Sequence, residues 1–150
     1  MRPLIAVVGG STCSDAEADL AEDVGRRLAV AGAVVVCGGL GGVMEAVSRG
    51  VRGAGGLTIG VLPGADPHEA NPYVDVPLAT GMGEMRNALI VRAARAVIAI
   101  GGGHGTLSEV ALALRIGTPV VGLHDRFPGL DLPRATDAAT AVAWVLERAI

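Results

Sequence analysis

The sequence alternates between short apolar runs and longer stretches of helical periodicity, and this alternation constrains the fold more than any other feature. The apolar runs are rich in β-branched side chains and lie at Leu4–Val8, Ala33–Cys37, Leu57–Leu62, Val74–Leu78, Ala96–Ile100 and Pro119–Leu123. Strands that are apolar at consecutive positions bury both faces, which is typical of parallel sheets covered by helices. The runs therefore predict the strands of a buried, mainly parallel sheet.

The intervening stretches predict helices at Asp15–Ala31, Val43–Ala54, Gly83–Ala94, Thr106–Ile116 and Asp137–Ala149. The first of these opens on a capping box, Ser14-x-x-Glu17, and is followed by Gly32, a residue typical of helix ends. Strands and helices that alternate in this way form a three-layer α/β fold with right-handed crossovers. We expect one doubly wound, Rossmann-like domain over residues 1–150, a length typical of a single domain.

The basic residues exclude several functions, because all twelve are arginine and the chain contains no lysine. A pyridoxal phosphate enzyme needs a lysine for its Schiff base, and a Walker A loop needs a lysine that reaches the phosphates. The net charge of −3 and the pI of about 5.5 give no basic field for nucleic acid. We therefore expect no lysine-dependent cofactor and no nucleic-acid partner.

The two cysteines, Cys13 and Cys37, are too few for a disulfide framework or a CxxC metal site. No histidine, cysteine and acidic residues have metal-ligand spacing, so no metal site is expected. The apolar run at the N-terminus is too short for a signal peptide, and the uncharged stretch 28–44 is interrupted by glycines. These features indicate a cytoplasmic protein without a membrane segment.

Three glycine-rich loops follow predicted strands, at Gly9–Thr12, Gly38–Gly42 and Gly101–Thr106. Ligands of doubly wound sheets bind beyond the carboxyl ends of the strands, where glycine lets backbone N–H groups approach an anion. The helix after each loop adds unpaired N–H groups, which together form a phosphate cradle. The loops could also be simple tight turns, but three at one edge favour binding. The predicted phosphate-binding residues are Gly10, Ser11, Thr12, Gly39, Gly41, Gly42, Gly102, Gly103, His104, Gly105 and Thr106.

Two ionisable residues lie near these loops, Glu109 in the helix after the third loop and Arg86 near the start of another helix. Glu109 has an alternative role, because Thr106-x-x-Glu109 also matches a capping box. Arg86 at a helix start is favourable if an anion lies nearby, and a solvated surface arginine is the alternative. His104 could contact a ligand or could be a polar loop residue. A dinucleotide is a poor fit, because the first loop lacks GxGxxG.

The motifs resemble those of the LONELY GUY (LOG) family, formerly called possible lysine decarboxylases. Gly101–Glu109 (GGGHGTLSE) resembles the PGGxGTxxE signature, Gly38–Ala46 (GGLGGVMEA) resembles the second glycine loop, and Gly83–Asn87 (GEMRN) occupies the place of Met-x-x-Arg-Lys. The similarity spans nearly the whole chain. The short DprA-related Rossmann branch and the molybdenum cofactor carrier proteins are also similar.

The resemblance implies two different functions. LOG enzymes are phosphoribohydrolases that hydrolyse the N-glycosidic bond of nucleoside 5′-monophosphates, and by position Arg86 and Glu109 would be their catalytic pair. Arg86 would bind the phosphate or ribose, or keep Glu109 ionised. The carrier proteins bind a phosphorylated pterin without turnover. Asn87 stands where the enzymes have lysine, which favours the carrier.

The resemblance also implies a homo-oligomer, such as a dimer, and a small phosphorylated ligand, either a nucleoside monophosphate or molybdopterin, with no required cofactor. A nucleotide-sensing module is a further alternative. The segment Pro63–Pro77, rich in Pro, His, Asn and Asp, is not expected to be regular structure and would influence ligand specificity. The absence of lysine excludes the pyridoxal phosphate decarboxylase that the older family label suggests.

Overall fold

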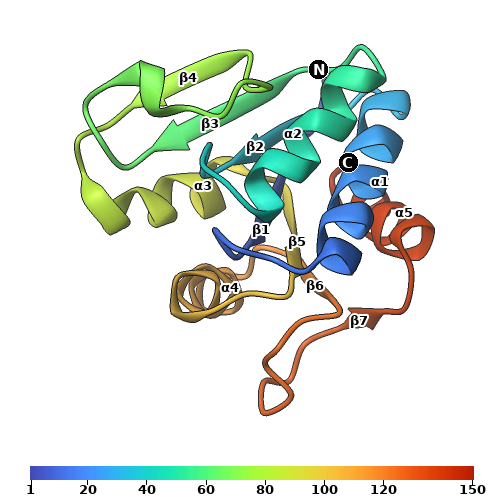
Figure 1. Ribbon diagram of the computed structural model, residues 1–150. Coiled ribbons are helices and arrows are strands. Elements are labelled where there is room, and N and C mark those ends of the chain that lie inside the picture. The colour runs from blue at the N-terminus through green and yellow to red at the C-terminus, as the bar shows by residue number, and fades with distance from the viewer.

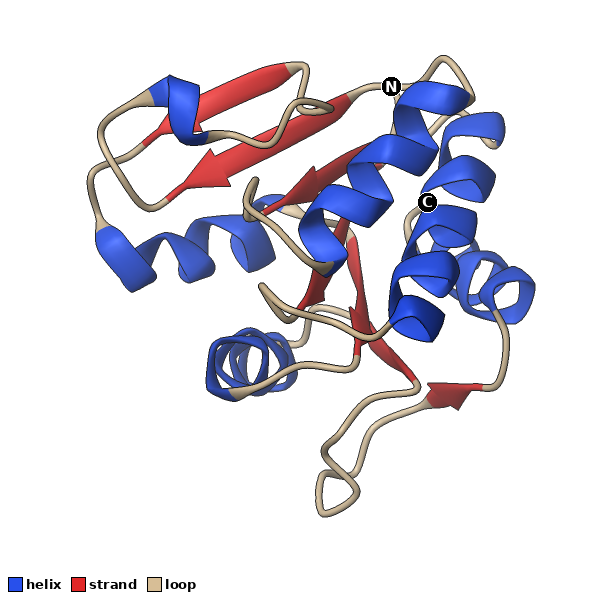
Figure 2. Cartoon of the chain, viewed as in Figure 1, coloured by secondary structure: helices blue, strands red, loops and turns tan.

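The computed structural model describes residues 1–150 and shows a seven-stranded sheet with helices on both faces (Figures 1 and 2). The strands are β1 (Leu4–Gly9), β2 (Val34–Cys37), β3 (Thr58–Leu62), β4 (Val76–Ala79), β5 (Ala96–Ile100), β6 (Val120–Leu123) and β7 (Arg134–Ala135). Their order is β4-β3-β2-β1-β5-β6-β7, and every neighbouring pair is parallel. The order reverses between β1 and β5, so the predicted doubly wound Rossmann-like fold is confirmed.

Two helical layers enclose the sheet. The α-helices are α1 (Asp15–Val30), α2 (Val43–Gly53), α3 (Asn87–Ala93), α4 (His104–Ile116) and α5 (Ala138–Arg148). The side chains of α1, α2 and α5 share one core with Ile5 and Val7 of β1, while α3 and α4 share the other core with Ala6 and Val8. Successive residues of the central strand thus face opposite layers, which explains the continuous apolar runs.

Helix α1 begins with the capping box that the sequence predicts. The Ser14 hydroxyl accepts a hydrogen bond from the Glu17 amide at 3.1 Å, and the Ser14 amide donates to Glu17 Oε1 at 3.0 Å. Helix α1 also lies unusually close to α2, because a Cβ on Gly25 or on Gly50 would collide with the backbone of the opposite helix. Glycine at these two positions lets the two helix backbones touch.

Several details differ from the sequence prediction. The helix expected at 83–94 begins as a 3-10 helix, η2 (Gly83–Arg86), before α3. The segment 63–77, expected to be irregular, contains the 3-10 helix η1 (Pro67–Glu69) and the first residues of β4. Strand β4 lies at the sheet edge with mostly exposed side chains, and β7 was not predicted because its two residues carry no periodicity. None of the helices has the length and apolar character needed to cross a membrane.

Candidate functional site

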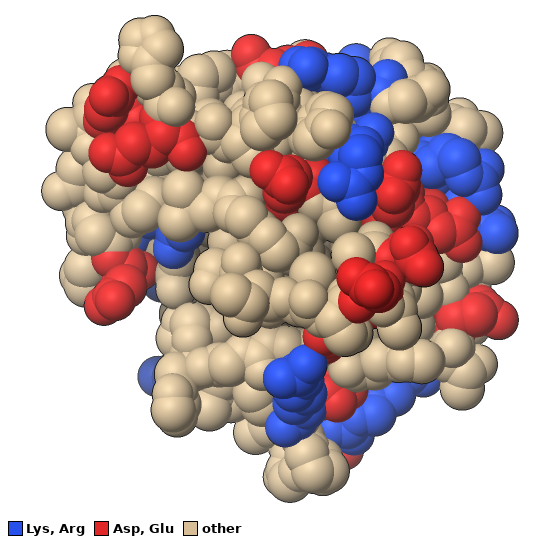
Figure 3. Space-filling model, viewed as in Figure 1, with Lys and Arg blue, Asp and Glu red and all other residues tan.

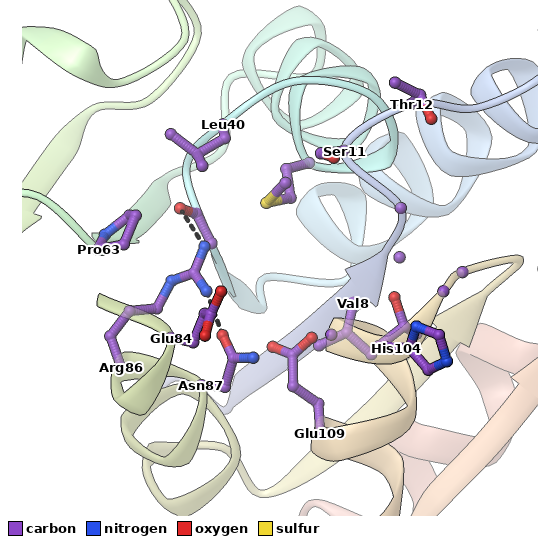
Figure 4. A pocket seen from close by; sticks show the side chains of 18 of the residues that line it. Val8, Ser11, Thr12, Leu40, Pro63, Glu84, Arg86, Asn87, His104 and Glu109 are labelled. Carbon is purple, nitrogen blue, oxygen red and sulfur yellow. Dashed lines mark hydrogen bonds between the residues drawn. The ribbon is translucent and has the colours of Figure 1, made fainter. Parts of the chain in front are cut away.

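A cavity of about 510 Å³ lies beyond the carboxyl ends of the strands, at the β1–β5 reversal of strand order. Its walls come from the loop after β1, the second glycine loop, η2 and α3, and the start of α4 (Figure 4). In the space-filling view the surface is hollowed between the regions of α3 and α4, with both acidic and basic atoms at its border (Figure 3). Its volume is within the range of small-molecule sites.

Not all of the predicted phosphate-binding glycines reach this cavity. The predicted residues that line it are Gly10, Ser11, Thr12, Gly102, Gly103, His104, Gly105 and Thr106. Of the second loop, Gly38 and Leu40 line the cavity, while Gly39, Gly41 and Gly42 lie behind it. A Cβ on Gly39 would approach the Leu62 side chain to 2.7 Å.

The second loop instead supports the first. Gly42 has a φ of 62°, and a Cβ there would collide with the Gly10 carbonyl. The Val43 amide, the first of α2, donates to that same carbonyl at 3.0 Å. Helix α2 has no side-chain cap, but its first amide donates to the first loop and is not free for a ligand.

The third loop presents the start of α4 to the cavity. Gly101 and Gly102 have φ values of 56° and 106°, which favour glycine, and α4 begins after Gly103 with no side-chain cap. Because the first N–H groups of a helix have no partner within it, this end attracts an anion. The capping-box alternative for Thr106 and Glu109 is wrong, because the helix begins before Thr106 and both residues lie inside it.

Glu109 is buried and faces the cavity from α4 (Figure 4), with only 7% of its surface exposed. Its carboxyl group makes no hydrogen bond or ion pair with another protein group. Burial raises the pKa of Glu109 from 4.5 to about 8, an effect that the positive charge of Arg86 only partly opposes. Arg86 therefore does not keep Glu109 ionised at neutral pH.

Arg86 is buried at 8% exposure, so the alternative of a solvated surface arginine is wrong. Its guanidinium donates to the Val61 carbonyl at 2.9 Å, to the Gly38 carbonyl at 3.5 Å and to Asn87 Oδ1. Burial lowers the pKa of Arg86 from its ordinary value, against the attraction of Glu109. The guanidinium thus connects η2 to the ends of β2 and β3.

Asn87 links the two walls of the cavity. Besides accepting from Arg86, its amide Nδ2 donates to the Ser108 hydroxyl at 3.2 Å, and that hydroxyl donates to the Gly105 carbonyl at 2.6 Å. The position that differs from the LOG motif is therefore a neutral hydrogen-bonding bridge between α3 and α4.

Arg126 belongs to none of the sequence motifs, yet it lies in the loop after β6 and lines the cavity. Its guanidinium donates to Glu17 Oε1 at 2.8 Å and is 61% exposed. A signal was present, because this loop also follows the carboxyl end of a parallel strand, but it has no glycine-rich motif. No group of three or more histidine, cysteine or acidic residues is placed to hold a metal ion.

The fold and this cavity define the class: a Rossmann-like α/β protein whose candidate site lies where the strand order reverses. Within that class the chain belongs to the SLOG cluster4 family, whose model matches residues 2–144. The resemblance to LOG proteins is thereby confirmed.

Curated relatives include enzymes of the LOG group. An Archaeoglobus fulgidus protein is 42% identical over 79% of this chain and 78% of its own length. The cytokinin riboside 5′-monophosphate phosphoribohydrolase LOG5 of Arabidopsis thaliana is 36% identical over 78% of this chain and 50% of its own length. The chain thus spans about half the length of the curated phosphoribohydrolase.

Solved structures match over nearly the whole of both chains. The molybdenum cofactor binding protein of Rippkaea orientalis has a TM-score of 0.90 and 34% identity, covering 98% of this chain and 97% of that one. The molybdenum cofactor carrier protein of Chlamydomonas reinhardtii has a TM-score of 0.89 and 36% identity, covering 98% of each chain. DNA processing protein A of Streptococcus pneumoniae, by contrast, shares only the fold, at 23% identity and a TM-score of 0.76, covering 95% of this chain and 61% of that one.

Proposed function

We propose that this protein binds a phosphorylated small molecule in the cavity and acts as a carrier of a phosphorylated pterin. The first candidate for that pterin is molybdenum cofactor. The observation that carries the proposal is the uncapped start of α4 beside a buried Glu109 with no protein partner. Two groups that the protein itself leaves unpaired face one cavity, and a ligand with a phosphate and further hydrogen-bonding groups would satisfy both.

In this proposal the phosphate lies at the first N–H groups of α4, between the Gly102–Thr106 turn and the Gly10–Thr12 loop. Backbone amides and hydroxyl groups would supply the hydrogen bonds, which suits a chain without lysine. Glu109 in its protonated form would donate to an acceptor on the ligand. Because none of the three aromatic residues lines the cavity, recognition depends on polar contacts rather than stacking.

Three features favour a carrier over an enzyme. The guanidinium of Arg86 is occupied by protein acceptors, and Asn87 replaces the lysine that accompanies the arginine in the LOG motif. The similarity to carrier proteins also extends over 98% of this chain and at least 97% of theirs, whereas it covers half of the curated phosphoribohydrolase.

A second function, hydrolysis of a nucleoside 5′-monophosphate, is favoured by the raised pKa of Glu109. A carboxylic acid that is protonated near neutral pH can act as a general acid. Glu109 would donate its proton to the base as the C1′–N bond breaks. Water would then form the new bond to C1′ and return a proton to the carboxylate, giving free base and ribose 5-phosphate.

Mass spectrometry of the natively purified protein tests the carrier, with molybdenum content measured on the same sample. A bound phosphorylated pterin supports it, and a protein that neither contains nor takes up the pterin when mixed with it contradicts it. Incubation with AMP or isopentenyladenosine monophosphate tests the enzyme, by chromatography of the released base. Release that is lost in Glu109→Gln supports hydrolysis, and the absence of release from the wild type contradicts it.

We also propose that the protein is a cytoplasmic homo-oligomer that does not bind nucleic acid. The support for assembly is a set of exposed apolar side chains on β4 and around η2 and α3: Val76, Leu78, Met82, Met85 and Leu89. Light scattering coupled to size-exclusion chromatography measures the oligomeric state, and a monomeric mass at high protein concentration contradicts the proposal. Electrophoretic mobility of single-stranded DNA tests the absence of nucleic-acid binding.

A further inference from the structure

We propose that Arg126 is the residue that selects an anionic ligand, by donating hydrogen bonds to its phosphate beside the third glycine loop. The inference rests on the proposed phosphate site and assigns it a side chain that the LOG motifs do not include. Arg126 lines the same cavity as Gly102, Gly103 and the start of α4.

The free hydrogen-bond donors distinguish Arg126 from Arg86. Arg86 directs Nε, NH1 and NH2 to protein acceptors and is 8% exposed. Arg126 makes a single side-chain hydrogen bond, from NH2 to Glu17, and is 61% exposed. A guanidinium has five N–H donors in a planar fork that matches phosphate geometry. Arg126 therefore keeps four of its five N–H donors free of protein acceptors, whereas Arg86 keeps two, and Arg126 is much the more exposed of the two.

The position of Arg126 is set by Glu17, which is itself fixed. Glu17 Oε1 accepts from the Ser14 amide, and the Glu17 amide donates to the Ser14 hydroxyl, which together form the α1 capping box. The other oxygen lies so close to Gly101 that a Cβ on that glycine would overlap it. These contacts place Glu17 against the third glycine loop, and the 2.8 Å ion pair brings the Arg126 guanidinium to the same place.

The backbone on either side of Arg126 is anchored as well. His124 adopts a φ of 52°, the one left-handed residue of the chain that is not glycine, and its carbonyl accepts from the Gly101 amide at 3.2 Å. The side chain of Asp125 is buried, and its carboxylate accepts from Arg134 Nε at 3.0 Å and from the Phe127 amide at 3.1 Å. The loop is thus attached to the third glycine loop, while the Arg126 side chain stays largely in solvent.

The charges of the cavity favour this assignment. The acidic residues that line it are Glu84 and Glu109, and burial keeps Glu109 protonated at neutral pH. The Arg126 guanidinium, partly balanced by the Glu17 carboxylate, places permanent positive charge next to the positive end of the α4 dipole. An anion at this point would meet both, and Glu17 would hold the guanidinium in place before binding, which lowers the entropy that binding costs.

Equilibrium binding of AMP and of inorganic phosphate, measured by calorimetry, tests the inference on the whole chain. The variants are Arg126→Gln, Arg126→Lys and the control Arg115→Gln, an exposed arginine at the far end of α4 that makes no side-chain hydrogen bond. Because hydrogen bonds to a charged group contribute more than neutral ones, we expect Arg126→Gln to weaken AMP binding about 10- to 100-fold. Arg126→Lys should recover part of the loss, and Arg115→Gln should bind like the wild type.

Thermal unfolding of the same variants separates binding from folding. The Arg126–Glu17 pair is mostly solvent-exposed on the arginine side, so its loss should hardly change the melting temperature. Wild-type affinity in Arg126→Gln overturns the inference and leaves the phosphate site standing. A wild type that binds neither AMP nor inorganic phosphate at millimolar concentration refutes the phosphate site at the start of α4, and the role of Arg126 with it, while pterin uptake tests the carrier function separately.

Discussion

The substitution Glu109→Gln tests whether burial keeps the Glu109 carboxyl group protonated. The pKa of Glu109 rises from 4.5 to about 8 in the folded protein because its carboxyl group is buried. A pKa difference of one between the folded and unfolded states corresponds to about 1.36 kcal/mol. The difference between 4.5 and about 8 therefore corresponds to about 5 kcal/mol of folding stability. Because the side chain is almost entirely buried, solvent screening reduces this figure little.

The direction in which the free energy of unfolding changes with pH follows from proton binding to Glu109 in the folded and unfolded states. Between pH 4.5 and pH 8 the folded protein holds a proton on Glu109 that the unfolded chain releases. The free energy of unfolding of the wild type therefore falls as pH rises through this window and levels off above it. Glutamine has the same shape and does not ionise, so the variant loses this pH dependence.

Urea unfolding followed by circular dichroism between pH 5 and pH 9 measures the effect. The variant should gain about 4 kcal/mol relative to the wild type between these two pH values, since most of the window lies between them. The difference in free energy of unfolding between the variant and the wild type at pH 5 then gives the effect of the substitution that does not depend on pH. Stability curves of the two proteins that run parallel from pH 5 to pH 9 would refute the reasoning.

Four other substitutions, one of them a control, have expected outcomes that urea or thermal unfolding can check. Asn87→Lys places an ammonium group near Glu109, so we expect the pKa of Glu109 to fall and the loss of stability between pH 5 and pH 9 to shrink; an unchanged slope contradicts this. Gly42→Ala should cost about 1–2 kcal/mol or more because of its φ of 62°, whereas Gly53→Ala, with open space and an ordinary φ, should be neutral or slightly stabilising. Ser14→Ala should cost about 1 kcal/mol by removing the α1 cap, and an unchanged melting temperature would argue against that role.

Most strands and helices could be predicted because they depend on residues that are close together in the sequence. Strand β5 is buried at every position, so Ala96–Ile100 reads as one continuous apolar run. The capping box of α1 depends on residues three apart, and both of its hydrogen bonds form. Strand β7 could not be predicted in this way, because Arg134–Ala135 becomes a strand only by pairing with β6.

The candidate site was predicted in part. The first and third glycine loops line the cavity as expected, because each directly follows a central strand. The role of Gly42 depends on its contact with the first loop, a tertiary contact that no motif encodes. The burial of Arg86 and the exposure of Arg126 also follow from tertiary packing, which the residue type alone does not reveal.

The close approach of α1 and α2 has a mechanical consequence. Gly25 and Gly50 bring the two helix backbones into contact, and the Val43–Gly10 hydrogen bond joins the loops at their N-termini. Helices α1 and α2 and the first glycine loop therefore form one rigid wall of the cavity. On the opposite wall, α3 and α4 are joined through side-chain hydrogen bonds such as Asn87–Ser108, which rearrange more easily than two helix backbones in contact. A ligand would lie between one wall fixed by backbone contacts and another held together by side-chain hydrogen bonds.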